Sequence, residues 1–129
     1  MDHSTIIGKI SDSEVEILRV LWEHTKPLTL AEIRTELNRR TLWEDSTIKT
    51  LLRRLCEKGA VLQERQKVFF YSPVITESEY EKYCTQKLID RLYKGSAKNL
   101  VAALVHEQKL SEADMTELWD MLKAGDADE

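Results

Sequence analysis

The segment from Thr29 to Tyr71 constrains the fold of this chain more than any other part of its sequence. Apolar residues recur at helical spacing over 30–40 and again over 45–58, which predicts two short amphipathic helices joined by a tight turn. Gly59 follows the second helix and suits the left-handed position just beyond a helix end. Residues 61–72 are rich in β-branched and aromatic side chains and predict a hairpin. Helix, turn, helix, glycine and hairpin is the order of elements in a winged helix-turn-helix.

Three pairs with capping-box spacing predict helix starts, because side chains at this spacing satisfy the free amides of a first turn. The pairs are Ser11–Glu14, Thr29–Glu32 and Thr76–Glu79. We expect the first helix to end at about 24–26, where Pro27 blocks its continuation. Leu28 then forms a short strand beside the hairpin. Arg39 and Arg40 are expected in the last turn of the next helix, where cations suit the helix dipole.

The hairpin strands are expected at 61–65 and 68–72. Gln66 and Lys67 stand between them, and they are not the Gly or Asn pair usual in a two-residue turn. The loop should therefore be longer or irregular, with Arg65 and Lys67 projecting from its tip.

Positive charge is concentrated in the same part of the chain. Residues 26–72 hold ten Lys or Arg against six Asp or Glu, whereas residues 1–25 carry a net charge of −3 and residues 73–129 a net charge of −5. The total is −4 over 129 residues, so the isoelectric point of the whole chain conceals a basic region. A local basic surface on a winged fold is the electrostatic signature of a nucleic-acid-binding module.

The helix over 45–58 has two chemically distinct faces. Its inner face is aliphatic and consists of Ile48, Leu51, Leu52 and Leu55. Its outer face offers hydroxyl groups and long cations, namely Ser46, Thr47, Lys49, Thr50, Arg53 and Arg54. Side chains of this kind contact base edges in the major groove, where Arg and Lys favour guanine and Ser and Thr are adaptable. This helix is therefore the candidate recognition helix.

Arg65 and Lys67 on the wing are expected to hold phosphates, which set the position on a duplex without selecting its sequence. Two other interpretations of the basic face stay open. It can be an ordinary solvated helix surface, because amphipathic helices usually carry charge on the outside. A winged helix can also bind another protein.

The second half of the chain predicts a helical region that makes a dimer. Helices are expected from Thr76 to about 93, over 97–106 and from Ser111 to about 123. These helices carry apolar residues on more than one side, and about fifty residues form only a thin core by themselves. The residues expected at an interface with an identical partner are Tyr83, Leu88, Ile89, Leu92, Tyr93, Leu100, Leu104, Leu118, Trp119 and Leu122. Packing against the first half is the alternative.

We therefore expect three regions. Residues 1–73 form a mostly α winged helix-turn-helix domain with three helices and a small β-hairpin wing, and residues 74–124 form the three-helix dimerisation domain. Residues 125–129 form a disordered acidic tail.

Composition excludes several other classes. No apolar run approaches the length of a membrane span, and the N-terminus lacks the apolar core of a signal peptide, so we expect a cytoplasmic protein without membrane contact. Cys56 and Cys84 form no CxxC pair and have no His at metal-ligand spacing, which predicts no metal site and no cofactor. Only four glycines occur, none in a phosphate-binding loop, and no nucleophile stands with a base, so an enzyme is not expected.

Four runs of sequence carry a family resemblance. They are ISDSEVEILRVLW at 10–22, STIKTLLRRLCEKG at 46–59, FFYSPV at 69–74 and RLYKGSAKNLV at 91–101. With them the chain resembles the BlaI/MecI-type penicillinase repressors, a bacterial winged-helix family with copper-responsive CopY-type relatives. The resemblance implies a homodimer that occupies a palindromic operator and blocks transcription of a β-lactamase-type resistance operon. It also assigns operator contacts to Ser46, Thr47, Lys49, Thr50 and Arg54, and dimerisation to the helices after Pro73.

Three departures from the family pattern affect how the chain would be regulated. In penicillinase repressors, induction follows cleavage of an Asn-Phe bond by a sensor protease, whereas Ala103 and Leu104 occupy the matching positions here. The copper-responsive relatives end in clustered cysteines, and the tail KAGDADE has none. Glu44 and Asp45 stand where relatives often have Ser-Pro, which adds negative charge near the groove.

The sequence thus favours a dimeric transcriptional repressor that binds double-stranded DNA. The alternatives are a non-enzymatic winged-helix module that binds protein, and a repressor of the same family that responds to another signal such as a metal. The operator, the regulated genes and the inducing signal do not follow from the sequence.

Overall fold

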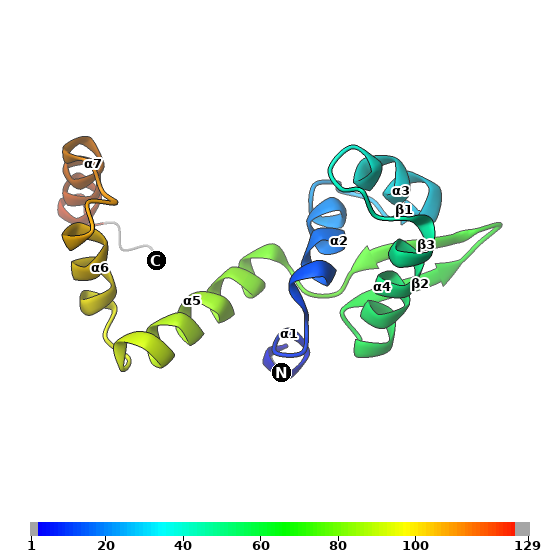
Figure 1. Cartoon of the computed structure of the whole chain (residues 1–129), viewed down its shortest axis with the longest axis horizontal. Helices are drawn as coiled ribbons and strands as arrows, with labels where there is room; N and C mark the ends of the chain where they lie inside the picture. Colours follow the sequence, from blue (N-terminus) through cyan, green and yellow to red (C-terminus); the bar gives the residue numbers. More distant parts are fainter. Residues whose placement is uncertain (1–2, 126–129) are drawn as a thin grey trace. The chain divides into compact units, whose positions relative to one another are not determined.

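The computed structural model describes residues 3–125, which fall into two compact units that divide between Cys84 and Thr85 (Figure 1). The elements in chain order are α1 (Ser4–Ile7), α2 (Asp12–Trp22), β1 (Leu28–Thr29), α3 (Leu30–Asn38), α4 (Asp45–Lys58), β2 (Val61–Arg65), β3 (Phe69–Pro73), α5 (Glu77–Tyr93), α6 (Ala97–His106) and α7 (Glu112–Lys123). The first unit is a winged helix-turn-helix and is followed by helices, as predicted. The division into units falls inside α5, later than the domain boundary expected at 73–74.

Local hydrogen bonds explain where the helices begin. Ser11 and Glu14 form a reciprocal capping box at α2, and Thr29 and Glu32 form another at α3. The Thr76 hydroxyl and the Glu79 carboxylate make the same pair of bonds at the start of α5. The predicted helix starts are confirmed, because capping needs only residues close in sequence.

Two helix ends differ from expectation. Helix α2 ends at Trp22, ahead of the predicted 24–26. Helix α3 ends at Asn38, so Arg39 is its C-cap and Arg40 lies beyond it rather than in the last turn. The chain turns at this point because the amides of Arg40 and Thr41 both donate to the Leu37 carbonyl, at 2.9 and 2.8 Å.

A three-stranded antiparallel sheet completes the first unit, with the strand order β1-β3-β2. Leu28 pairs with Tyr71, which confirms the short strand expected beside the hairpin. Strand β2 has the predicted bounds, whereas β3 begins at Phe69, one residue later than expected. The loop between them therefore has three residues, and Gln66 N–H donates to the Val68 carbonyl at 2.9 Å.

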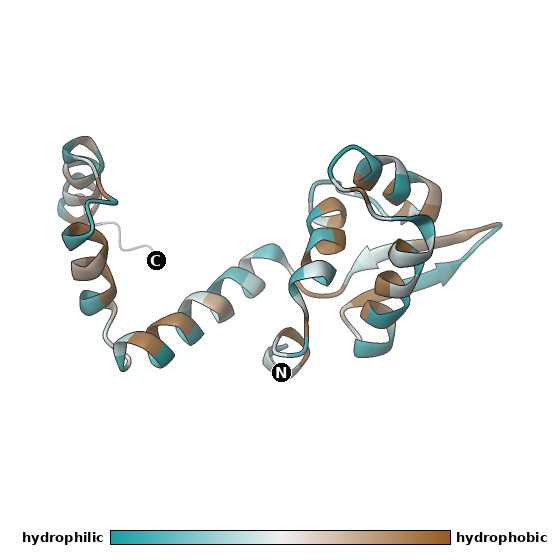
Figure 2. Ribbon diagram, viewed as in Figure 1, coloured by the Kyte–Doolittle hydropathy of each residue, from teal (hydrophilic) through white to brown (hydrophobic). Residues whose placement is uncertain are grey.

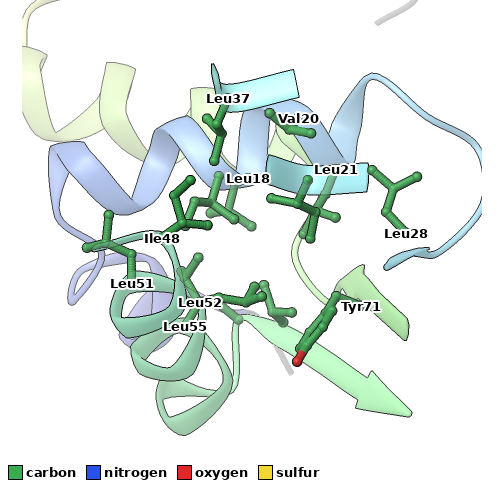
Figure 3. Close-up of a cluster of buried hydrophobic side chains, with 14 of the residues drawn as sticks. Leu18, Val20, Leu21, Leu28, Leu37, Ile48, Leu51, Leu52, Leu55 and Tyr71 are labelled. Carbon is green, nitrogen blue, oxygen red and sulfur yellow. The ribbon is translucent and has the colours of Figure 1, made fainter. Parts of the chain in front are cut away.

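The hydrophobic core of the first unit lies where α2, α3, α4 and the sheet meet. Figure 3 shows side chains from these elements pointing toward one another, among them Leu18, Leu37, Leu55 and Tyr71. Each Leu or Ile buried in this way contributes about 1.5–3 kcal/mol relative to an exposed side chain. This burial holds α4 in place along its aliphatic face.

A buried ion pair fastens the end of α4 to the start of α2. The Glu14 side chain is 1% exposed, and its two oxygens accept hydrogen bonds from Lys58 Nζ at 2.6 and 2.9 Å. Lys58 Nζ also donates to the Lys9 carbonyl at 2.7 Å. The pairing of Glu14 with Lys58 was not predicted from the sequence, because 44 residues separate the two.

The N-terminal helix α1 was not predicted, and it packs on the first unit through buried Ile7. The start of α5 also belongs to this unit. Trp22 Nε1 donates to the Ile75 carbonyl at 3.0 Å, and the Trp22 and Tyr80 rings lie 5.8 Å apart. Burial raises the pKa of Tyr80 to about 12. These contacts fix the first turns of α5 on the winged-helix unit.

The second unit contains the rest of α5 with α6 and α7. The bounds of α6 match the prediction, and α7 ends at Lys123 as expected. Lys94 and Gly95 both adopt positive φ, at 51° and 82°, and separate α5 from α6. The expected tail beyond Gly125 lies outside the described residues. No helix in the described part of the chain is both long and apolar enough to cross a bilayer.

Candidate nucleic-acid interface

Helix α4 presents the predicted polar face to solvent. Its aliphatic side chains are all buried, which fixes the rotation of the helix. The residues on the other side are Ser46, Thr47, Lys49, Arg53 and Arg54, all exposed, and Thr50, which is half-buried. The helix follows a tight turn, and its C-terminus is closed by Gly59 with φ at 83°. The expected recognition helix therefore has the predicted bounds and the predicted open face.

A shallow hollow marks the outer face of α4. It has a volume of about 220 Å³, and its lining includes Ser46, Thr47, Thr50 and Arg54. Four of the six residues expected to contact DNA on this helix are therefore contiguous. The arrangement offers hydroxyl donors and acceptors beside one guanidinium group, which is the chemistry needed at base edges.

Several cations of the basic segment are already paired within the molecule. Arg53 contacts Glu57 one turn later on α4 at 3.1 Å, and Arg34 contacts Asp45 at 3.4 Å. Arg40 pairs with Glu23 and Glu36, and Glu23 raises the pKa of Arg40 by accepting its hydrogen bond.

Lys49, Arg54 and Lys67 make no ion pair with any residue in the described range. Their charges are therefore fully available to a phosphate or a base edge. Arg53 is exposed but paired, and a partner would have to compete with Glu57 for it.

The wing places its two expected cations differently. Arg65 pairs across the hairpin with Phe69, and its guanidinium carbon lies 5.3 Å from the centre of the Phe69 ring. A cation over an aromatic face is held in a defined orientation. Lys67 stands in the three-residue loop at the tip. The predicted irregular loop is confirmed.

Acidic groups lie at the start of α4. Glu44 is the N-cap residue, and its side chain makes no capping hydrogen bond. Asp45 follows in the first turn and pairs with Arg34 of α3. The Asp45 contact was missed in the sequence because it joins two helices.

Cys56 and Cys84 do not cluster with other potential metal ligands in the part of the chain that the structure describes. Within residues 3–125, no group of three His, Cys, Asp or Glu side chains is arranged to hold a metal ion. Cys56 is half-buried, and this burial raises the pKa of its thiol, whereas Cys84 is exposed.

The model of the penicillinase repressor family matches residues 10–124. The chain belongs to this family. It is 33% identical over 118 residues to the penicillinase repressor of Bacillus licheniformis, with 91% of each chain covered. It is 30% identical over 123 residues to the methicillin resistance regulatory protein MecI of Mammaliicoccus sciuri, with 95% of this chain and 98% of the relative covered.

Solved structures of a penicillinase repressor resemble the first unit. One is the solution structure of monomeric Bacillus licheniformis BlaI in complex with the blaP half-operator, which is 40% identical with a TM-score of 0.51. The other is the DNA-binding domain of the repressor BlaI, also 40% identical, with a TM-score of 0.52. Each match covers 57% of this chain and 90% of the other. The family is one of transcriptional repressors, and the winged-helix fold is that of its DNA-binding domain.

The residues that we expected in a dimer interface fall into three groups. Tyr83 packs on the core of the winged-helix unit of its own chain, which differs from the expected role. Ile89 is buried in the single chain, and Tyr93 and Leu100 are half-buried. The remaining residues are exposed, namely Leu88, Leu92, Leu104, Leu118, Trp119 and Leu122.

Proposed function

We propose that this member of the penicillinase repressor family is a homodimeric transcriptional repressor that occupies a palindromic operator. Each subunit inserts α4 into the major groove, and the wing contacts the flanking backbone. Occupancy of the operator blocks transcription, and the protein acts in the cytoplasm. No catalytic step is part of this function.

The observation that carries the proposal is the open outer face of α4. Its aliphatic side is buried to the last residue, so the helix cannot rotate to hide the polar side. Lys49 and Arg54 lie on that polar side without an ion pair among the described residues. DNA offers two kinds of acceptor for these cations, namely guanine N7 and O6 in the major groove and the phosphate oxygens of the backbone.

The comparison with BlaI supports the same assignment. The BlaI structure with a half-operator covers the winged-helix part of this chain at 40% identity. We assign base contacts to Ser46, Thr47, Lys49, Thr50 and Arg54, and backbone contacts to Lys67. Arg53 and Arg65 contribute as further contacts at the edge of the bound surface.

The exposed apolar residues of the second unit support a dimer. Leu92, Trp119 and Leu122 are 64%, 58% and 69% exposed, and exposed apolar side chains gathered on one region mark an interaction surface. Figure 2 shows hydrophobic residues distributed over α6 and α7. An identical partner that buries these side chains would bring two recognition helices into one complex, and helix-turn-helix dimers bind half-sites about one turn of DNA apart, roughly 10 bp.

The function is tested by selecting a duplex from a random-sequence pool with the full-length protein and measuring its affinity by fluorescence anisotropy. We expect a palindromic selected sequence and an affinity that falls steeply as salt rises, because phosphate contacts release counterions. Binding to protein only, with no retention of DNA at low salt, would contradict the proposal and favour a winged-helix protein-interaction module.

Matched variants separate the proposed contacts. Arg54→Ala should weaken binding of the selected duplex by about 1–3 kcal/mol and relax the sequence preference at one base pair. Lys67→Ala should weaken all duplexes about equally. Arg39→Ala is the control, since Arg39 is exposed at the C-terminal end of α3 and pairs with Glu36. Equal affinities for all three variants would show that α4 does not face the duplex.

Dimerisation is tested by sedimentation of the Trp119→Glu variant. Glu117→Gln, which changes an exposed residue on the same helix, is the control. We expect Trp119→Glu to shift the protein toward monomer. Its affinity for the palindrome should fall far more than its affinity for a single half-site. Circular dichroism checks that α7 remains helical. A monomeric wild-type protein at micromolar concentration would contradict the dimer.

Cleavage by a sensor protease at Ala103–Leu104 is not part of the proposal. These residues stand where the family resemblance places the cleaved Asn-Phe bond of penicillinase repressors, and both lie inside helix α6. A metal signal is likewise not proposed, because the described chain offers no ligand cluster for one.

A further inference from the structure

A groove lies between the start of α3 and the wing, and the proposed function does not use its apolar part. Its volume is about 450 Å³. Leu30, Phe69 and Tyr71 line its floor, and Arg65 and Lys67 lie on the wing side. Figure 2 shows that hydrophobic residues continue along β3 toward the wing. Phe69 is 40% exposed, which is unusual for an aromatic side chain unless something covers it.

The apolar floor extends toward the recognition helix. A second hollow of about 570 Å³ shares Leu30, Phe69 and Tyr71 with the first and continues to Cys56 and Lys49 on α4. Tyr71 is oriented within this floor, because its hydroxyl accepts a hydrogen bond from Gln63 Nε2 at 3.0 Å. The two hollows therefore share one apolar floor, and the second also has Glu57, paired with Arg53, on its lining.

The charge around the first hollow has one sign. No Asp or Glu is among its lining residues, and Arg65 and Lys67 have no ion pair in the described part of the chain. The Arg65 guanidinium is already held over the Phe69 ring. At the start of α3, the capping box engages the amides of Thr29 and Glu32, so the cationic groups lining the hollow are the side chains of Arg65 and Lys67.

We propose that this groove binds a small carboxylate with a flat apolar body. Arg65 holds the carboxylate through a charge-assisted pair of hydrogen bonds, Lys67 adds a second charge, and the apolar body covers Leu30 and Phe69. The volume is within the range of small-molecule sites. The site differs from the DNA contacts on α4 in being mostly apolar.

The consequence for regulation depends on the proposed function. A ligand that engages Arg65 and Lys67 removes two cations from the DNA-facing wing, so ligand and operator compete. The groove then supplies an inducing signal that needs neither a protease nor a metal.

The test uses the full-length protein and 2-naphthoate as the probe, followed by backbone amide chemical shifts. Naphthalene-2-methanol has the same ring without the charge, and acetate has the charge without the ring. We expect 2-naphthoate to shift the amides of 29–31 and 65–71. The alcohol should bind about tenfold more weakly, because it lacks the charged hydrogen bonds, and acetate should cause no localised shift.

Variants separate the site from general adhesion. Arg65→Gln should lower the affinity for 2-naphthoate about tenfold. Ala31→Trp should fill the groove and abolish binding while both wing cations remain, and Arg39→Gln should bind like the wild type. In anisotropy measurements, 2-naphthoate should weaken the selected duplex for the wild type and leave the Ala31→Trp complex unchanged.

Three results would overturn the proposal: no localised shift at millimolar 2-naphthoate, shifts confined to α6 and α7, or equal binding of the acid and the alcohol. These results are independent of the proposed function, because DNA binding is measured separately without the probe. A protein that binds the probe in the groove but retains no duplex would contradict the proposed function alone.

Discussion

The cations of the basic segment differ in what they can do, and this difference appears only at the scale of single residues. Arg34, Arg40 and Lys58 are paired with carboxylates of other helices, so their charge supports the fold. Lys49 and Arg54 have no such partner among the described residues and supply the charge of the α4 surface. A count of Lys and Arg along the sequence cannot separate the two groups, because the partners are distant in sequence.

The Lys58 ion pair leads to the first prediction. Lys58→Ala leaves the buried Glu14 carboxylate without its cation, so the free energy of unfolding should fall by about 3 kcal/mol. Urea unfolding followed by circular dichroism measures the change. Lys49→Ala, an exposed cation on the same helix, should stay within about 0.5 kcal/mol of the wild type. Equal effects of the two substitutions would show that the pair does not support the fold.

A second prediction at this scale concerns pH. The Thr29 backbone amide donates to Glu32 and is the main reason that the pKa of Glu32 lies below its ordinary value of 4.5. A lowered folded-state pKa adds stability that is present above pH 4.5 and is lost as the pH falls through the folded-state value. Glu32→Gln should therefore lower the melting temperature at neutral pH, and the difference from the wild type should vanish in acid.

The pH comparison has a control on another helix. Glu81 is exposed on α5 and has no capping role, so Glu81→Gln should not reproduce this pattern. A difference between Glu32→Gln and the wild type that persists unchanged at low pH would contradict the role of the Glu32 charge.

At the scale of elements, most helix starts could be predicted and some ends could not. Starts depend on local caps such as Ser11 with Glu14 and Thr29 with Glu32, which are visible in the sequence. The end of α2 was predicted two to four residues too late, and the end of α3 about two residues too late, since no glycine marks either end in the sequence. The turn after α3 depends instead on the amides of Arg40 and Thr41, which both donate to the Leu37 carbonyl. Helix α1 was missed because four residues carry no periodic signal.

The candidate site was predictable to a similar extent. The two faces of α4 follow from helical periodicity, and the structure has the same buried set. The groove beside Phe69 was not predictable, because it depends on the register that pairs Arg65 with Phe69 and Thr29 with Phe70. The packing of Tyr83 on the first unit was equally invisible, since α5 carries apolar residues on two sides.

The end of α4 gives a prediction for one element. Gly59 has φ of 83°, and a Cβ there would lie 3.6 Å from Ile6 Cδ1, which is an ordinary contact. The cost of Gly59→Ala therefore comes from the backbone and should be about 1–2 kcal/mol in urea unfolding. Gly59→Asn should cost less, because Asn tolerates the left-handed region better. The reverse order would contradict a backbone origin.

At the scale of the whole molecule, the two units differ in what their surfaces offer. The first unit has a complete core and an open polar helix face, and each of these features can be explained within the unit. The second unit has exposed apolar faces and one buried apolar residue, Ile89, among those described. Under the proposed function, a partner subunit covers these faces, and a DNA-binding unit followed by such a helical unit is the organisation expected of a dimeric repressor.

The most direct test of the DNA-binding face is dimethyl sulfate protection of the selected duplex, since this reagent methylates guanine N7 in the major groove. The bound wild-type protein should protect guanines in both halves of the palindrome. Arg54→Ala should restore the reactivity of one guanine in each half while others remain protected. A saturated complex in which every guanine N7 reacts as in free DNA would show that α4 does not enter the major groove.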